Sequence, residues 1–176
     1  LLAEGKQLMS NSDLRKEDKE KFKSIPEEAR LKRVRSIARD FGTKAYARKM
    51  LEMASSKEGA DMAEPALYEA FLSLKSSANP KLFEVGENYV ARFKANEKSQ
   101  AVLLSMIQLA LQATDFRRAG TYLETYASRY PQESQARTFG EQAMNIYRNL
   151  GMYEDAADIA KSMGQSERSL SLLAEG

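Results

Sequence analysis

Carboxylates are the only conventional catalytic side chains that could act together in this sequence, because it contains no His and no Cys. The ordinary serine triad, cysteine nucleophiles and imidazole-ligated metal sites are therefore excluded. Closely spaced carboxylates occur at Glu27 and Glu28, at Glu84 and Glu87, and at Glu154, Asp155 and Asp158. Each set lies at or near the start of a predicted helix, where acidic side chains interact favourably with the helix dipole. With no calcium loop or glycine-rich phosphate loop, we predict a protein that is not an enzyme, with no catalytic residue, metal or cofactor.

The first third of the chain is basic. Residues 1–58 carry 15 Lys and Arg against 10 Asp and Glu, whereas the remaining residues carry 12 against 15. The densest basic stretch falls on a predicted helix at 27–41, where Arg30, Arg33 and Arg35 could contact phosphates. Acidic residues flank this stretch, and no exposed aromatic platform for base stacking accompanies it. We therefore expect a solvated helix face and no nucleic-acid partner, with nucleic-acid binding through these arginines as an alternative.

Helical periodicity runs along most of the 176 residues, of which 43% are hydrophobic and 30% are charged. No apolar run reaches the roughly 18 residues needed to span a membrane. Apolar residues recur at spacings of three and four, as in Ala63, Ala66 and Leu67, which predicts amphipathic helices. Strand-like alternation is absent. Helices are predicted at 27–41, 43–57, 60–76, 80–94, 97–113, 115–130, 132–149, 153–163 and from about 165.

The second helix of each predicted pair carries a small residue followed by apolar residues three, four and seven places later. The small residues are Ala47, Gly86, Ala119 and Ala156, at successive spacings of 39, 33 and 37 residues. A period in the mid-thirties with one helical hairpin per unit is typical of a helical solenoid. A small side chain at this position lets the paired helices approach closely. The sequence therefore predicts an all-α fold built as an α-solenoid of antiparallel helical hairpins.

Two inter-helix turns resemble those of tetratricopeptide repeats, in which a turn is followed by an aromatic residue and, three places later, by Ala. The segments are Leu150-Gly151-Met152-Tyr153-Glu154-Asp155-Ala156 and Ala113-Thr114-Asp115-Phe116-Arg117-Arg118-Ala119. Tyr130-Pro131 matches the proline that ends such a repeat. The resemblance is good over about 97–163 and implies a right-handed, TPR-like superhelix. The turn pattern looks most like bacterial cell-envelope members of the family, which implies the periplasm or envelope, with the cytoplasm as the alternative.

The resemblance also implies a binding surface. In this family the first helix of each hairpin lines a concave groove, and the residues outside its apolar pattern face that groove. The corresponding residues here are Gln108, Gln112, Glu141, Asn145 and Arg148. Their amide, carboxylate and guanidinium groups can exchange hydrogen bonds with a peptide. Asn145 stands where some peptide-binding repeats use Asn, whereas Glu141 stands where members that clamp carboxylates carry a cation.

We expect two parts in the chain, a charged helical or flexible connector over 1–25 and a TPR-like α-solenoid over 26–176. The start at Leu1 indicates a fragment of a longer chain. The predicted function is that of a non-enzymatic scaffold or adaptor, which binds another protein or a peptide in the groove during assembly of a bacterial envelope complex. Two alternatives remain: an accessory α-superhelical domain of a larger enzyme, such as a glycan-processing one, and a nucleic-acid-binding helical repeat.

Overall fold

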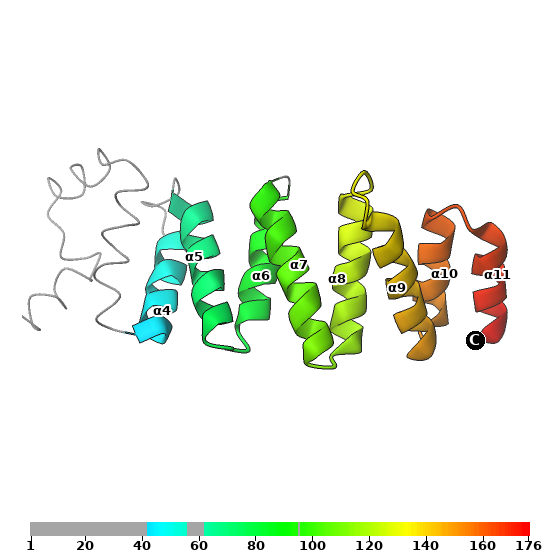
Figure 1. Cartoon of the computed structure of the whole chain (residues 1–176), viewed down its shortest axis with the longest axis horizontal. Helices are drawn as coiled ribbons and strands as arrows, with labels where there is room; N and C mark the ends of the chain where they lie inside the picture. Colours follow the sequence, from blue (N-terminus) through cyan, green and yellow to red (C-terminus); the bar gives the residue numbers. More distant parts are fainter. Residues whose placement is uncertain (1–41, 56–61, 95) are drawn as a thin grey trace, which may run out of the picture. The chain divides into compact units, whose positions relative to one another are not determined.

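The computed structural model describes residues 42–55, 62–94 and 96–176. These residues form eight α-helices and no strand (Figure 1), so the all-α prediction is confirmed for this part of the chain. The helices are α4 (Gly42–Ser55), α5 (Ala63–Ser76), α6 (Leu82–Arg92), α7 (Glu97–Gln112), α8 (Phe116–Arg129), α9 (Ala136–Asn149), α10 (Tyr153–Ser162) and α11 (Ser166–Glu175). The expected connector over 1–25, its boundary at residue 26, and the basic helix with Arg30, Arg33 and Arg35 lie outside the described residues.

The chain divides into two compact units, Leu1–Val85 and Gly86–Gly176. In the first unit α4 packs against α5. The Tyr46 hydroxyl donates to Glu69 Oε2 at 3.1 Å, so a polar contact joins these two helices beside their buried apolar residues. In the second unit α7 packs against α8, α8 against α9, α9 against α10, and α10 against α11. Each of these helices therefore packs against its neighbours in chain order, as Figure 1 shows.

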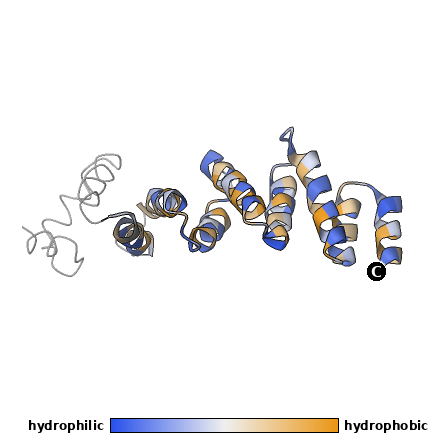
Figure 2. Ribbon diagram, turned by 60° about the horizontal axis from the view of Figure 1, so that its bottom comes forward, coloured by the Kyte–Doolittle hydropathy of each residue, from blue (hydrophilic) through white to orange (hydrophobic). Residues whose placement is uncertain are grey.

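The core of the second unit comes from the apolar face of each helix. Figure 2 shows that these helices carry hydrophobic residues beside hydrophilic ones. The Tyr126 ring of α8 packs edge-on against the Phe139 ring of α9, with centroids 4.9 Å apart. The side chains that are at most 1% exposed are Val102, Leu103, Met106, Ala110, Ala119, Leu123, Tyr126, Ala143, Met144, Ala156 and Ala160, together with Tyr89 and Ser99. The predicted periodicity thus places these residues in the core.

The small residues of the sequence pattern are buried as predicted. Ala119 and Ala156 are 0% exposed, Ala47 is 2% exposed, and Gly86 is also buried. A close contact between α8 and α9, however, lies at the next position, Gly120. A Cβ atom at Gly120 would lie 2.8 Å from Tyr147 Cε1, which is shorter than a normal van der Waals contact. The pattern therefore identified the buried region but not the glycine that contacts the neighbouring helix.

Three helix ends of the second unit share one backbone conformation. Gly151 and Gly164, which follow α9 and α10, have φ values of +73° and +75°. Thr114, which follows α7, has the same left-handed conformation with φ of +55°. In each case the next amide donates back to the helix, as when Met152 N donates to the Tyr147 carbonyl at 2.8 Å. This motif satisfies carbonyls that the helix end would otherwise leave unpaired. The three helices end within one residue of the ends predicted at 113, 149 and 163.

The start of α9 differs from the prediction. The periodicity placed it at residue 132, whereas the helix begins at Ala136. Pro131 is followed by two successive turns, in which Glu133 N donates to the Tyr130 carbonyl and Ala136 N donates to the Glu133 carbonyl, both at 3.0 Å. These turns engage the main-chain amides of Glu133 and Ala136, so these groups do not form the hydrogen bonds of a helix that begins at residue 132.

Candidate functional site

The five predicted groove residues lie on α7 and α9, outside the buried faces that build the core. On α7, Gln108 and Gln112 are exposed, whereas Met106 and Ile107 are buried. On α9, Asn145 and Arg148 are exposed and Glu141 is half-buried. The same helix buries Gly140, Ala143, Met144 and Tyr147. Each helix therefore uses one face for packing and presents the predicted polar residues on another.

Helix α11 supplies partners for two of these residues, which the sequence did not predict. The Arg148 guanidinium donates from Nε to Glu175 Oε2 at 2.7 Å and from Nη2 to Glu175 Oε1 at 3.0 Å. This is the paired geometry in which a guanidinium binds a carboxylate most specifically. Nearby, Arg168 Nη2 donates to Asn145 Oδ1 at 3.2 Å. The site thus extends from α9 onto α11.

The other three residues are placed differently. Glu141 accepts a hydrogen bond from Arg137 Nε at 3.4 Å within α9, as an exposed pair four residues apart. Gln108 and Gln112 lie one turn apart on α7. Among the described residues, no hydrogen bond joins these two glutamines to the α9 residues. The structure therefore brings Asn145 and Arg148 together with α11, and leaves the α7 glutamines as a separate exposed pair.

Tyrosine hydroxyls form a second set of polar contacts between helices. Tyr122 of α8 donates to Glu87 Oε1 of α6 at 2.5 Å, and Tyr147 of α9 donates to Glu124 Oε2 of α8 at 3.0 Å. Burial of the phenol, helped by the carboxylate of Glu87, raises the pKa of Tyr122 well above its ordinary value. Burial likewise raises the pKa of Tyr147 to about 12. Both phenols therefore stay protonated at neutral pH and act as hydrogen-bond donors that join helices.

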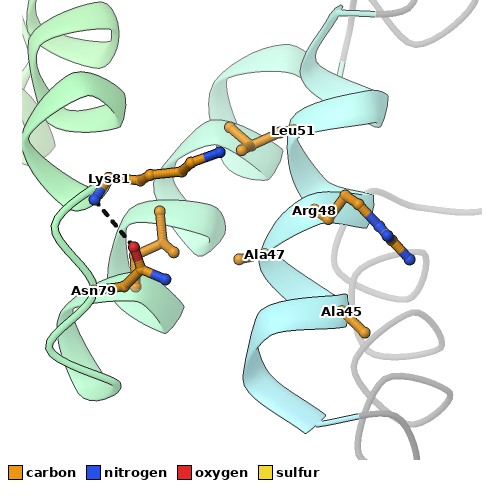
Figure 3. Close-up of a pocket in the computed structure, with 7 residues that line it drawn as sticks. Ala45, Ala47, Arg48, Leu51, Asn79 and Lys81 are labelled. Carbon is orange, nitrogen blue, oxygen red and sulfur yellow. Dashed lines mark hydrogen bonds between the residues drawn. The ribbon is translucent and has the colours of Figure 1, made fainter.

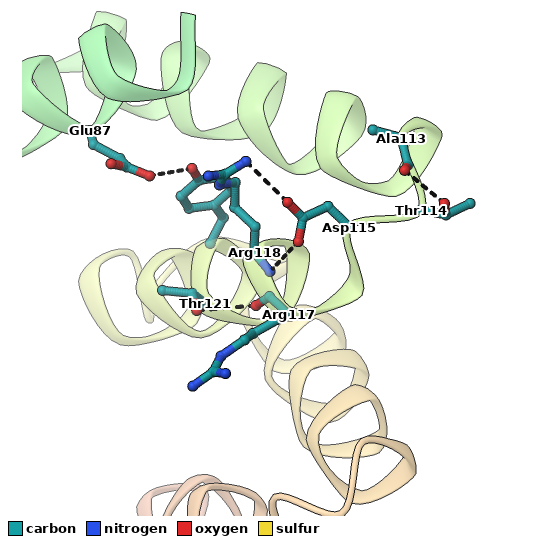
Figure 4. Close-up of polar contacts among 8 residues, drawn as sticks. Glu87, Ala113, Thr114, Asp115, Arg117, Arg118 and Thr121 are labelled. Carbon is teal, nitrogen blue, oxygen red and sulfur yellow. Dashed lines mark hydrogen bonds and ion pairs between the residues drawn. The ribbon is translucent and has the colours of Figure 1, made fainter. Parts of the chain in front are cut away.

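The turn between α7 and α8 is fixed by side-chain hydrogen bonds (Figure 4). Asp115 Oδ1 accepts from the Arg118 main-chain nitrogen at 3.1 Å, and its Oδ2 accepts from Arg118 Nη1 at 3.0 Å. An Asp that accepts from the amide three residues later is a favourable N-cap, because it pairs a free amide of the first turn. Asp115 is thus the N-cap of α8.

The closely spaced carboxylates of the described residues lie at helix starts or in a contact between helices, whereas Glu27 and Glu28 lie outside the described residues. Glu154 and Asp155 lie in the first turn of α10, and Glu84 lies in the first turn of α6. Glu87 accepts the Tyr122 hydrogen bond. Within 42–55, 62–94 and 96–176, no group of three or more acidic side chains is arranged to hold a metal ion.

A hollow of about 530 Å³ lies in the first unit, and the sequence analysis did not predict it (Figure 3). Ala47 of α4 and Leu74 of α5 contribute buried apolar surface, and Leu51 and Lys81 also line it. Figure 3 shows the Lys81 amine extending toward Leu51, whereas the Arg48 guanidinium points away from both residues. The two cations therefore do not converge on one point.

No family model, curated protein or solved structure matches the chain. None of the described helices is long and apolar enough to cross a membrane. The described chain is an all-α protein whose helices pack in a manner compatible with a helical repeat.

Proposed function

We propose that this chain is a non-enzymatic protein-interaction module, built as a right-handed α-solenoid of antiparallel hairpins similar to tetratricopeptide repeats. It binds a peptide segment of another protein on the surface formed by α7 and α9, and the resemblance suggests a role in assembly of a bacterial envelope complex. Support comes from the packing of consecutive helices in the second unit and from the short left-handed turns after α7, α9 and α10.

One observation carries the proposal. The residues selected from the sequence as groove residues are exposed or half-exposed, although they lie on helices whose other faces are fully packed. Asn145 and Arg148 contribute little to the core, and their contacts to α11 are exposed, so a partner can reach both side chains by replacing those contacts. Amide and guanidinium groups together supply acceptors and donors, which suits a peptide backbone and its polar side chains. Arginine is also enriched among residues that dominate binding energy at interfaces.

The test is partner capture with the full-length protein, followed by the double substitution Asn145→Ala and Arg148→Ala. If this pair is a hot spot, the affinity for the captured partner falls by about 5- to 150-fold, which corresponds to roughly 1–3 kcal/mol. Thermal unfolding stays nearly unchanged, because surface substitutions usually alter stability by no more than about 0.5 kcal/mol.

The matched control removes one amide and one cation elsewhere on the same unit. Gln132 in the turn before α9 and Lys161 in the last turn of α10 are both exposed. The variant with Gln132→Ala and Lys161→Ala retains partner binding. If both double variants bind like the parent, the binding surface does not include Asn145 and Arg148, and the proposed site is wrong.

A further inference from the structure

The carboxylate of Glu175 is bound to the guanidinium of Arg148, which is part of the proposed site. Both of its oxygens accept from the Arg148 guanidinium, at 2.7 and 3.0 Å. Arg148 lies in the last turn of α9, and Glu175 is the last residue of α11. The contact spans 27 residues of sequence, so it depends on how α11 docks and not on local helix geometry. The structure thus contains an example of a carboxylate bound at this position.

The contact between Arg148 and Glu175 is exposed and can be exchanged. Their side chains are 51% and 35% exposed, respectively. Ion pairs at the protein surface add little to stability, because water solvates both charges well when they separate. An arginine guanidinium stays protonated at physiological pH with or without a partner, so Arg148 remains charged when the contact with Glu175 opens. A carboxylate from another molecule can therefore replace Glu175 without disrupting the core.

The surroundings of Arg148 add a second cation. Arg168 of α11 reaches Asn145 on α9, which places another guanidinium at the contact between these helices. An acidic ligand side chain complements this pair of guanidinium groups.

We infer that Glu175 is an internal competitor for the partner, and that the partner binds Arg148 through an aspartate or glutamate side chain. This inference rests on the proposed function and specifies its partner chemistry. Binding then requires the ligand carboxylate to displace Glu175 from the guanidinium. Because Glu175 must first be displaced, it lowers the affinity for every acidic ligand. It also excludes neutral ligands, because only an anionic ligand forms a new ion pair with Arg148.

The chain itself indicates a suitable probe. Leu172-Leu173-Ala174-Glu175-Gly176, which supplies the internal carboxylate, recurs as residues 1–5. A synthetic peptide Leu-Leu-Ala-Glu-Gly with an acetylated amino end and an amidated carboxyl end carries one ionisable group, the glutamate. The matched peptide with Gln in place of Glu is neutral. A third peptide, with Gln and a free terminal carboxylate, tests whether a main-chain carboxylate serves as well.

The experiment is a titration of the 176-residue chain with each peptide. Binding is monitored through the chemical shift of the Arg148 Nε–H group in NMR spectra. The glutamate peptide shifts this signal, and the neutral peptide does not. Glu175→Gln tightens binding of the glutamate peptide about two- to five-fold, the range expected when an exposed competing ion pair is removed. Arg148→Ala abolishes that gain. Glu167→Gln makes the same change of charge on an exposed residue of α11 and leaves the affinity unchanged.

Three outcomes overturn the inference. They are equal affinities of the parent and the Glu175→Gln variant, an equal gain from Glu167→Gln, or no shift of the Arg148 signal with the glutamate peptide in either form. If the free terminal carboxylate binds and the glutamate peptide does not, the side-chain assignment is wrong. None of these results decides the proposed function, which depends on partner capture by the Asn145 and Arg148 double variant.

Discussion

Two glycines inside helices allow the packing of the second unit to be tested by one substitution made twice. Gly120 lies in α8 and Gly140 lies in α9, and replacement by Ala adds a single Cβ atom at each. In both helices Ala raises helix propensity by about 1 kcal/mol relative to Gly. The two substitutions therefore share the same favourable contribution and differ in what the new atom contacts.

At Gly120 the added atom meets a rigid neighbour. It would lie 2.8 Å from Tyr147 Cε1 and 3.3 Å from Ile146 Cγ2. The Tyr147 ring cannot move freely, because its hydroxyl bonds Glu124 at 3.0 Å and Thr121 at 3.3 Å. Overpacking of this kind destabilises a protein by about 1–3 kcal/mol. With a central value of about 2 kcal/mol against the propensity gain of about 1 kcal/mol, Gly120→Ala lowers the free energy of unfolding by about 1 kcal/mol.

At Gly140 the added atom meets a flexible neighbour. Met163 Sδ would lie at 3.0 Å and Met163 Cε at 3.5 Å. A methionine side chain adjusts easily because it is unbranched and has three rotatable bonds. The propensity gain then dominates, and Gly140→Ala raises the free energy of unfolding by up to about 1 kcal/mol.

Urea unfolding followed by far-UV circular dichroism measures both changes. A double-mutant cycle with Tyr147→Phe tests the cause, since loss of the hydroxyl releases the ring and reduces the penalty of Gly120→Ala by about 0.5 kcal/mol or more. Destabilisation of similar size at both glycines, or a penalty at Gly120 that Tyr147→Phe leaves unchanged, would refute the reasoning.

Three further outcomes are expected. Ala119→Leu overpacks a residue that is 0% exposed and lowers the free energy of unfolding by about 1–3 kcal/mol, whereas an unchanged urea midpoint would contradict the repeat phasing. Thr114→Gly relieves a left-handed φ of +55° and stabilises by about 1 kcal/mol, while Gly151→Ala, at φ of +73°, destabilises by a similar amount in the same assay. Tyr147 titrates near pH 12 in an ultraviolet absorbance titration compared with Tyr147→Phe. Because its folded pKa is raised from 10.0, its contribution to stability is complete below pH 10 and is lost as the pH rises toward 12.

The sequence predicted what depends on local periodicity. Apolar spacing located the described helices, because burial of one helix face requires residues three and four apart. The stops at Thr114 and Gly151 were also predictable, since a left-handed residue after a helix pairs the last carbonyls. The predicted start of α9 was four residues too early, because apolar spacing gives no information on the two turns that follow Pro131.

Contacts between exposed residues could not be predicted in the same way. The partners of Arg148 and Asn145 are 27 and 23 residues distant and lie on an exposed surface, where no apolar pattern constrains residue type. The role of Gly120 was missed for a related reason. Its neighbour Ala119 satisfied the small-residue pattern, and the pattern gives no information on which of two adjacent small residues contacts the ring of Tyr147.

Helix α9 shows why packing and binding can be altered independently in this molecule. Its buried residues, including Met144 and Tyr147, set the position of the helix against α8 and α10. Its exposed residues contact α11, Asn145 through one hydrogen bond from Arg168 and Arg148 through an exposed two-hydrogen-bond ion pair with Glu175. Core substitutions therefore change the free energy of unfolding by several kilocalories per mole, whereas substitutions at Asn145 or Arg148 have only a small effect on it. A binding defect at these two positions with unchanged unfolding thus reports on recognition alone.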